Sequence, residues 1–137
     1  MKKLLLLLAL GLTTLSMNAQ DLRNVNNSSI GKIESDGTVR NSSNSTVGKI
    51  EKDGTIRNSS NSSIGKIDSD GTVRNANNSS IGKVESDGTV RNSSNSAIGK
   101  IDKDGTVRNS SNSAIGYAKG VPVRYAALFF FFDFFKK

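Results

Sequence analysis

The sequence predicts an all-β protein, a shallow closed barrel of radially arranged β-hairpin repeats with its C-terminal segment packed at the centre. Three observations predict this fold. A 17-residue unit recurs five times, each copy carries an Asp-Gly pair between β-branched residues, and all six phenylalanines lie near the C-terminus. A hairpin is marginally stable alone, so the copies must bury one another, and closing them into a ring leaves no strand edge free.

Residues 1–19 have the layout of a secretory signal peptide. A lysine pair precedes the apolar run 4–12, and Ala19 is a small residue suited to cleavage before Gln20. The apolar run is well below the roughly 20 residues that a membrane-spanning helix needs. We therefore expect an exported protein that resides in the periplasm, on the outer surface or in the medium.

The composition argues against catalysis. The chain has no His and no Cys, so common bases, nucleophiles and soft metal ligands are missing. Each Lys, Arg, Asp and Ser of the repeat occurs in about five equivalent copies, whereas an active site needs one differentiated group of residues. The acidic turns resemble calcium loops but lack the six to eight oxygen ligands that calcium takes. We expect no enzyme, no cofactor and no metal.

The repeat accounts for most of the chain. Its first copy reads IGKIESDGTVRNSSNST. A partial copy precedes it at residues 22–29, and a degraded copy follows at residues 115–118 and at Val123-Arg124. We therefore assign residues 20–124 to the repeats and residues 125–137 to an apolar Phe-rich segment. The five full copies begin at Ile30, Val47, Ile64, Ile81 and Ile98.

The side-chain pattern predicts the turn. With Ser35-Asp36-Gly37 as a three-residue loop, Ile33 pairs with Val39 and the apolar residues share one face. A two-residue loop would instead place Ile33 opposite Arg40. Gly31 is the expected site of a bulge, because Ile30 is out of phase with Ile33. The Asn/Ser tracts are expected to link one hairpin to the next.

The C-terminal segment is apolar on every side at both the strand and the helix period, which is typical of a segment buried all round. A single copy cannot obey the symmetry of a ring, so we expect it on the axis as a short helix, or else as a last strand. Contact with a membrane is the alternative role for this tail. A β-solenoid is the alternative fold. The six rings are Phe129, Phe130, Phe131, Phe132, Phe134 and Phe135.

The recurring IGKI-x-x-DGTVRN-x-S unit, the signal peptide and the Phe-rich end resemble the bacterial β-flower repeat proteins, and five full units resemble the five-fold form. The resemblance covers nearly all of the mature chain. It implies a shallow barrel of hairpin petals, similar in outline to Tubby-like domains with their apolar central helix. The Tubby-like outline implies lipid headgroup binding by analogy of fold alone. No activity of the family transfers to this chain.

Two functions from different classes fit these observations. The first is a binding module for an anionic or lipid-like ligand, such as a lipid headgroup or an acidic glycan. The second is a structural or self-assembling cell-surface protein, which the Asn/Ser richness favours. We expect no nucleic acid partner, because the aromatic residues are confined to the tail. A ring of arginines is the candidate anion-binding site: Arg40, Arg57, Arg74, Arg91 and Arg108.

Overall fold

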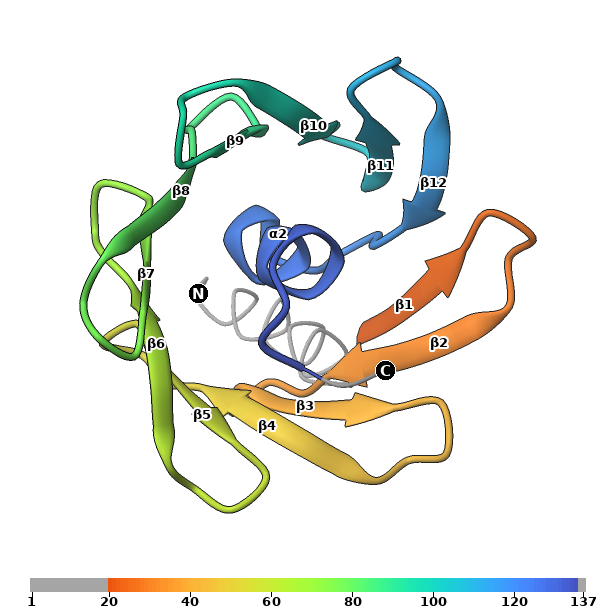
Figure 1. Ribbon diagram of the computed structural model, residues 1–137. Helices are drawn as coiled ribbons and strands as arrows, with labels where there is room; N and C mark the ends of the chain where they lie inside the picture. The colour runs from red at the N-terminus through yellow and green to blue at the C-terminus, as the bar shows by residue number, and fades with distance from the viewer. Residues whose placement is uncertain (1–19, 136–137) are drawn as a thin grey trace, which may run out of the picture.

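The computed structural model describes residues 20–135 as twelve β-strands and one α-helix. The strands form one antiparallel sheet that closes into a barrel in the order β1-β12-β11-β10-β9-β8-β7-β6-β5-β4-β3-β2. Figure 1 looks along the barrel, with the helix at its centre. The closed barrel of hairpins is therefore confirmed, and the solenoid alternative is wrong. The signal peptide predicted for residues 1–19 lies outside the described residues.

All twelve strands are short, with four or five residues each. The strands are β1 (Gln20–Asn24), β2 (Ser29–Ile33), β3 (Thr38–Asn41), β4 (Thr46–Ile50), β5 (Thr55–Asn58), β6 (Ser63–Ile67), β7 (Thr72–Asn75), β8 (Ser80–Val84), β9 (Thr89–Asn92), β10 (Ala97–Ile101), β11 (Thr106–Asn109) and β12 (Ala114–Tyr117). The helix is α2 (Val123–Phe131).

The Asp-Gly turns have the predicted three-residue loop. Ile33 lies opposite Val39, and the Gly37 amide donates to the Glu34 carbonyl oxygen at 2.9 Å. Gly37 has a φ of 93°, a conformation that L side chains rarely adopt. Asp36 Oδ1 accepts a hydrogen bond from the backbone amide of Thr38 at 2.9 Å. The loop therefore places the apolar side chains of both strands on the inner face.

The turn aspartates predict acid sensitivity. The backbone amide two residues on lowers the pKa of each carboxyl below the ordinary value of 3.8, in Asp36, Asp53, Asp70, Asp87 and Asp104. A lowered folded-state pKa gives stability that is present above the unfolded value and is lost as the pH falls through the folded values. We expect the thermal midpoint to fall between about pH 5 and about pH 2.

A fivefold variant separates these carboxyls from the other acids. Serine can still accept the turn hydrogen bond, although more weakly, and it does not titrate in this range. Replacing all five aspartates by Ser should therefore lower the midpoint at neutral pH and flatten its fall on acidification. An equally steep fall in the variant would assign the acid sensitivity to other groups.

The Asn/Ser tracts form a second, ordered turn. Asn41 Oδ1 accepts hydrogen bonds from the amides of Ser43 and Ser45 at 2.9 and 3.0 Å. Asn44 adopts a φ of 68°, a region that asparagine tolerates better than most residues. These loops join β1 to β2, β3 to β4 and so on, and several reach the periphery of the molecule in Figure 1. The predicted linkers between the Asp-Gly hairpins are therefore tight loops. Each of these loops, together with the two strands that it joins, is one of the six petals of the barrel.

The predicted bulge is present and recurs. Leu22 lies opposite Gly31, whereas Arg23 lies opposite Ser29, so Ile30 is an extra residue in β2. The same register shift occurs between β3 and β4, where Val47 is the extra residue. The bulge restores the phase, so that Gly31 and Ile33 both face the barrel interior.

The ends of the repeat region close the ring together. β1 pairs with β12, with Arg23 opposite Tyr117 and Asn24 opposite Gly116. The N-terminal partial copy thus supplies the strand that the last copy lacks. Val123 and Arg124, which the repeat pattern aligns with the Val-Arg of the unit, begin helix α2 instead of a strand. Pro122, at the N-cap of the helix, has a φ of −55° that suits a helix start.

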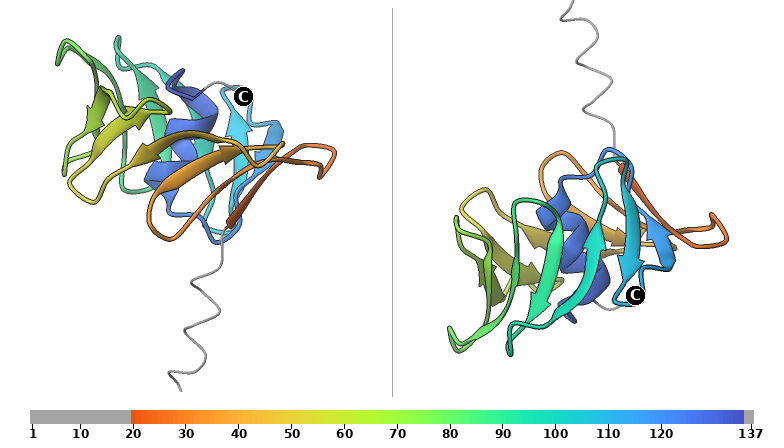
Figure 2. Two further views of the ribbon diagram at one scale, coloured as in Figure 1. Left: turned by 90° about the horizontal axis from the view of Figure 1, so that it is seen from below. Right: turned by 90° about the horizontal axis from the view of Figure 1, so that it is seen from above.

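Helix α2 and the residues after it fill the barrel, and the side views in Figure 2 show the helix inside the wall of strands. A short central helix is therefore confirmed. A Cβ added at Gly48 would lie 2.6 Å from Cε1 of Phe135 and 2.5 Å from the carbonyl oxygen of Arg57. Six strand glycines each face one ring in this way. The pairs are Gly31 with Phe129, Gly48 with Phe135, Gly65 with Phe134, Gly82 with Phe132, Gly99 with Phe131, and Gly116 with Phe130.

This pairing explains the composition of the strands. Consecutive phenylalanines face glycines of consecutive petals around the ring, so a single segment packs against all six petals. The Ile and Val of the next layer pack in the same core, and Val39 and Ile56 have no exposed surface. Among residues 20–135, no polar or charged side chain is buried. The described interior of the barrel is therefore apolar.

Candidate functional site

The five predicted anion-binding arginines lie on the outer wall, and each is already paired. Arg40 Nε donates to Glu34 Oε2 at 2.9 Å, and its Nη1 donates to the carbonyl oxygen of Asn44 at 3.2 Å. Arg57, Arg74, Arg91 and Arg108 repeat both contacts. The hydrogen bond that Arg108 donates to the Asp102 carboxylate raises the pKa of Arg108 above its ordinary value. Each guanidinium therefore fastens a petal loop to the wall, with its charge balanced by a carboxylate.

The repeated lysines are placed differently. In the sheet register Lys49 lies between Thr38 and Arg57 on the outer face. Lys66, Lys83 and Lys100 have matching neighbours, whereas Lys32 lies between Asp21 and Arg40. Within the part of the chain that the structure describes, the six ion pairs shorter than 4.0 Å all use arginine. The positive charge of Lys49 is a minor cause of the lowered pKa of the Asp36 carboxyl. These lysines are Lys32, Lys49, Lys66, Lys83 and Lys100.

A shallow hollow of about 190 Å³ lies beside one of these lysines, between neighbouring petals. Thr89 lies opposite Lys100 in the sheet, and Asn109 and Asn112 come from the adjacent petal. No carboxylate lines this hollow. One cation with neighbouring amide and hydroxyl groups is an arrangement suited to an anion that also carries hydroxyl groups.

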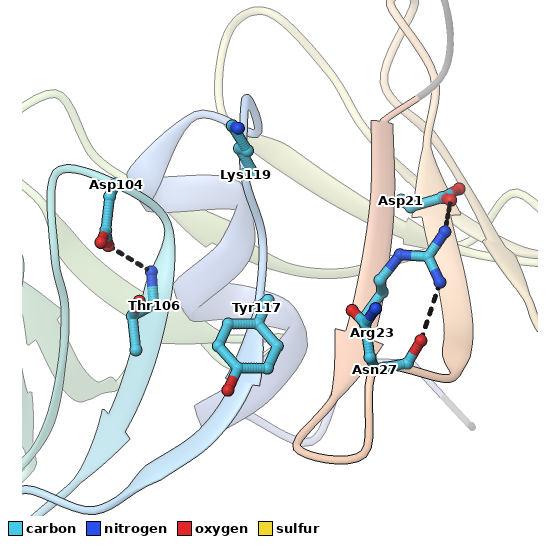
Figure 3. Close-up of a pocket in the computed structure, with 7 residues that line it drawn as sticks. All are labelled: Asp21, Arg23, Asn27, Asp104, Thr106, Tyr117 and Lys119. Atoms are coloured by element: carbon cyan, nitrogen blue, oxygen red, sulfur yellow. Dashed lines mark hydrogen bonds and ion pairs between the residues drawn. The ribbon is translucent and has the colours of Figure 1, made fainter.

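A larger hollow of about 450 Å³ lies where β12 meets β1 and is called the seam hollow here. Figure 3 shows Tyr117 between two polar walls, one formed by Asp104 and Thr106 and the other by Asp21 and Arg23. Arg23 Nη2 donates to Asp21 Oδ2 at 2.8 Å, and the Thr106 amide donates to Asp104 Oδ1 at 3.0 Å. The seam hollow therefore combines an aromatic ring with groups of both charges.

Sequence reasoning missed the seam hollow, although the signal was present. Tyr117 stands where the full repeats have Lys, and Lys119 stands where they have Glu or Asp. Asp21 stands where they have Thr. Departures from a repeat mark the positions where a ring stops being symmetric. These three residues meet because the first and last strands, β1 and β12, pair in the closed barrel.

Two further findings bear on function. Among residues 20–135, no group of three or more His, Cys, Asp or Glu side chains is placed to hold a metal ion. In the same range, the structure contains no helix with the length and apolarity required to cross a membrane. Each turn aspartate accepts a hydrogen bond from the backbone amide two residues on.

The fold is a ring of hairpin petals that closes through the pairing of β1 with β12, and the C-terminal segment of the chain fills its centre. Residues 19–135 match the family model of the 5-fold beta-flower proteins, and the chain belongs to this family. Five full repeats and five Asp-Gly turns agree with that description, while the pairing of β1 with β12 closes the ring at a sixth position that has no Asp-Gly turn. The comparisons with curated proteins and with solved structures returned no match.

Proposed function

We propose that this protein is an exported, non-enzymatic binding module that holds an acidic polysaccharide against the repeated lysines of its outer wall. One observation carries the proposal: the repeated arginines are neutralised by carboxylates at 2.8–2.9 Å, whereas the repeated lysines have no such partner among residues 20–135. The anion-binding role predicted for the arginines therefore passes to the lysines. The signal-peptide layout of residues 1–19 supports an extracellular ligand.

A polymer suits this surface better than a small anion. Each of the five repeated lysines offers one positive charge on the outer wall, which supports only weak binding at one site. Five repeated lysines around the ring multiply such weak contacts when a single polymer chain engages several of them. Asn and Ser groups beside the lysine also suit the hydroxyls of a sugar polymer.

The rival function, a self-assembling surface protein, has less support. Assembly through strands needs free edges, and the barrel described for residues 20–135 has none because β1 pairs with both β2 and β12. Burial within the tail supports a role in the core over contact with a membrane, since Phe129 and Phe135 are only 1% exposed.

Two matched variants test the proposal. The first replaces the exposed wall lysines Lys66 and Lys100 by Gln, and the second replaces the exposed turn lysines Lys52 and Lys103 by Gln. Both remove two positive charges, so they differ only in position. We expect retention of the mature chain on immobilised polygalacturonate to weaken by about tenfold in the first variant and much less in the second, because each surface charge contact is worth about 1 kcal/mol. Retention of the parent should fall as salt is raised.

The outcomes are distinct. Equal losses in both variants would show a response to net charge alone, and no retention of the parent would remove the acidic polysaccharide as ligand. Binding to phosphatidylglycerol vesicles in place of polygalacturonate would assign the lysines to a membrane. Arg57→Gln should chiefly lower the thermal midpoint, because it releases Glu51 and the petal loop.

A further inference from the structure

The seam hollow exists because no turn joins β12 to β1. In each full repeat an Asp-Gly loop connects the two strands of the hairpin and covers the space beside them. At the seam the chain instead runs from Ala118 through residues 119–122 into helix α2. The seam also has two register pairs, where each full hairpin has three. An open, non-repeated surface therefore remains at this single position of the ring.

Tyr117 forms the floor of this surface. It lies on the outer face between Thr106 and Arg23 in the sheet register, and it is half-buried. Figure 3 shows its ring between the two polar walls of the hollow. The equivalent residue of every full repeat is Lys, which offers no flat apolar face. The seam is therefore the one strand position of the outer wall where a ring-shaped ligand can stack on an aromatic side chain.

The charged groups around Tyr117 balance one another. Asp21 and Asp104 supply two negative charges, and Arg23 and Lys119 supply two positive charges. Arg23 also donates to the carbonyl oxygen of Asn27 at 2.9 Å. These hydrogen bonds fix the Asp21 carboxylate and the Arg23 guanidinium in place before any ligand arrives. A surface of this kind presents rigid donors and acceptors without a net charge.

We propose that the seam hollow binds a single uncharged sugar ring, as a site separate from the lysines of the outer wall. A hexose has an apolar C–H face that stacks on an aromatic ring and a rim of hydroxyl groups. The carboxylates of Asp21 and Asp104 accept hydrogen bonds from such hydroxyls, while Arg23 and Lys119 donate to them. The volume of about 450 Å³ falls within the range usual for small-molecule sites. The balanced charge favours a neutral sugar over an anionic one.

The composition supplies a direct probe of this site. The chain has two tyrosines and no tryptophan, so Tyr125→Phe leaves Tyr117 as the single fluorescent reporter. Glucose, galactose, mannose and N-acetylglucosamine are titrated separately into this variant at millimolar concentrations. We expect at least one of them to change the Tyr117 emission in a saturable way. Failure of all four to do so would overturn the proposal.

Further variants separate stacking from nonspecific effects, with amide chemical shifts of Arg23 and Lys119 as the readout. Tyr117→Phe should keep the affinity, whereas Tyr117→Lys, which restores the repeat residue, should weaken it by about tenfold. Asp21→Asn should also weaken it. Binding unchanged in Tyr117→Lys would contradict the inference. The Lys66→Gln, Lys100→Gln variant should bind the sugar normally, so a failure of the polysaccharide proposal leaves this result distinguishable.

Discussion

Truncation after Tyr125 is expected to abolish cooperative unfolding. The deletion removes all six phenylalanines and the fully buried Leu128 from the centre of the barrel. Truncating one buried Phe to Ala costs about 3–5 kcal/mol, and a domain of this size has about 5–15 kcal/mol in total. Loss of Phe129 and Phe135 alone thus approaches the whole stability, and the ring of strand glycines is left facing an empty space.

The measurement is thermal unfolding by circular dichroism, with size-exclusion chromatography to detect aggregation. Truncation after Phe135 is the matched control, because it removes only Lys136 and Lys137 and should melt like the parent. A synthetic peptide of residues 122–137 added to the truncated chain should restore part of the transition. A truncated chain that melts as cooperatively as the parent would show that the segment is not the core.

Local pattern was sufficient to predict the hairpin. Period-two alternation around Asp36-Gly37 admits one register that puts Ile33 and Val39 on the same face, and the structure has that register. The odd spacing from Ile30 to Ile33 required a bulge, which is present. The symmetry argument placed the aromatic tail on the axis, because one segment cannot pack equivalently in a ring of repeats. These inferences required only the spacing of nearby residues in the sequence and the number of repeats.

The features that sequence reasoning missed depend on ring closure. Reading along the chain assigned Val123-Arg124 to the last copy, although Leu22-Arg23 at the other end completes it. Pairing between the first and last strands is not encoded locally, so the seam hollow with Tyr117 could not be assembled from the repeat alone. The balance between Arg and Lys also needs coordinates, since only the distance from Arg40 to Glu34 shows which cation is neutralised.

Gly48→Ala is expected to lower the free energy of unfolding by about 3 kcal/mol through the addition of a single methyl group to a strand. The new Cβ would lie 2.6 Å from Phe135 and 2.5 Å from the carbonyl oxygen of Arg57, and real Cβ contacts essentially never fall under 3.0 Å. Urea unfolding measures the change. Lys49→Ala, on the outer face of the same strand, is the control and should change stability by about 0.5 kcal/mol or less.

A double-mutant cycle tests whether each glycine is matched to its own ring. Phe135→Ala removes the side chain that the new methyl group meets, so combining it with Gly48→Ala should cost less than the sum of the single changes. The relief should be partial, because the Arg57 carbonyl oxygen stays in place. Phe132→Ala is the matched comparison, since that ring faces Gly82 and its effect should add to that of Gly48→Ala. Equal interaction free energies in both combinations would contradict this pairing. They would mean that any of the aromatic rings can pack against Gly48, so that no ring is matched to a particular glycine.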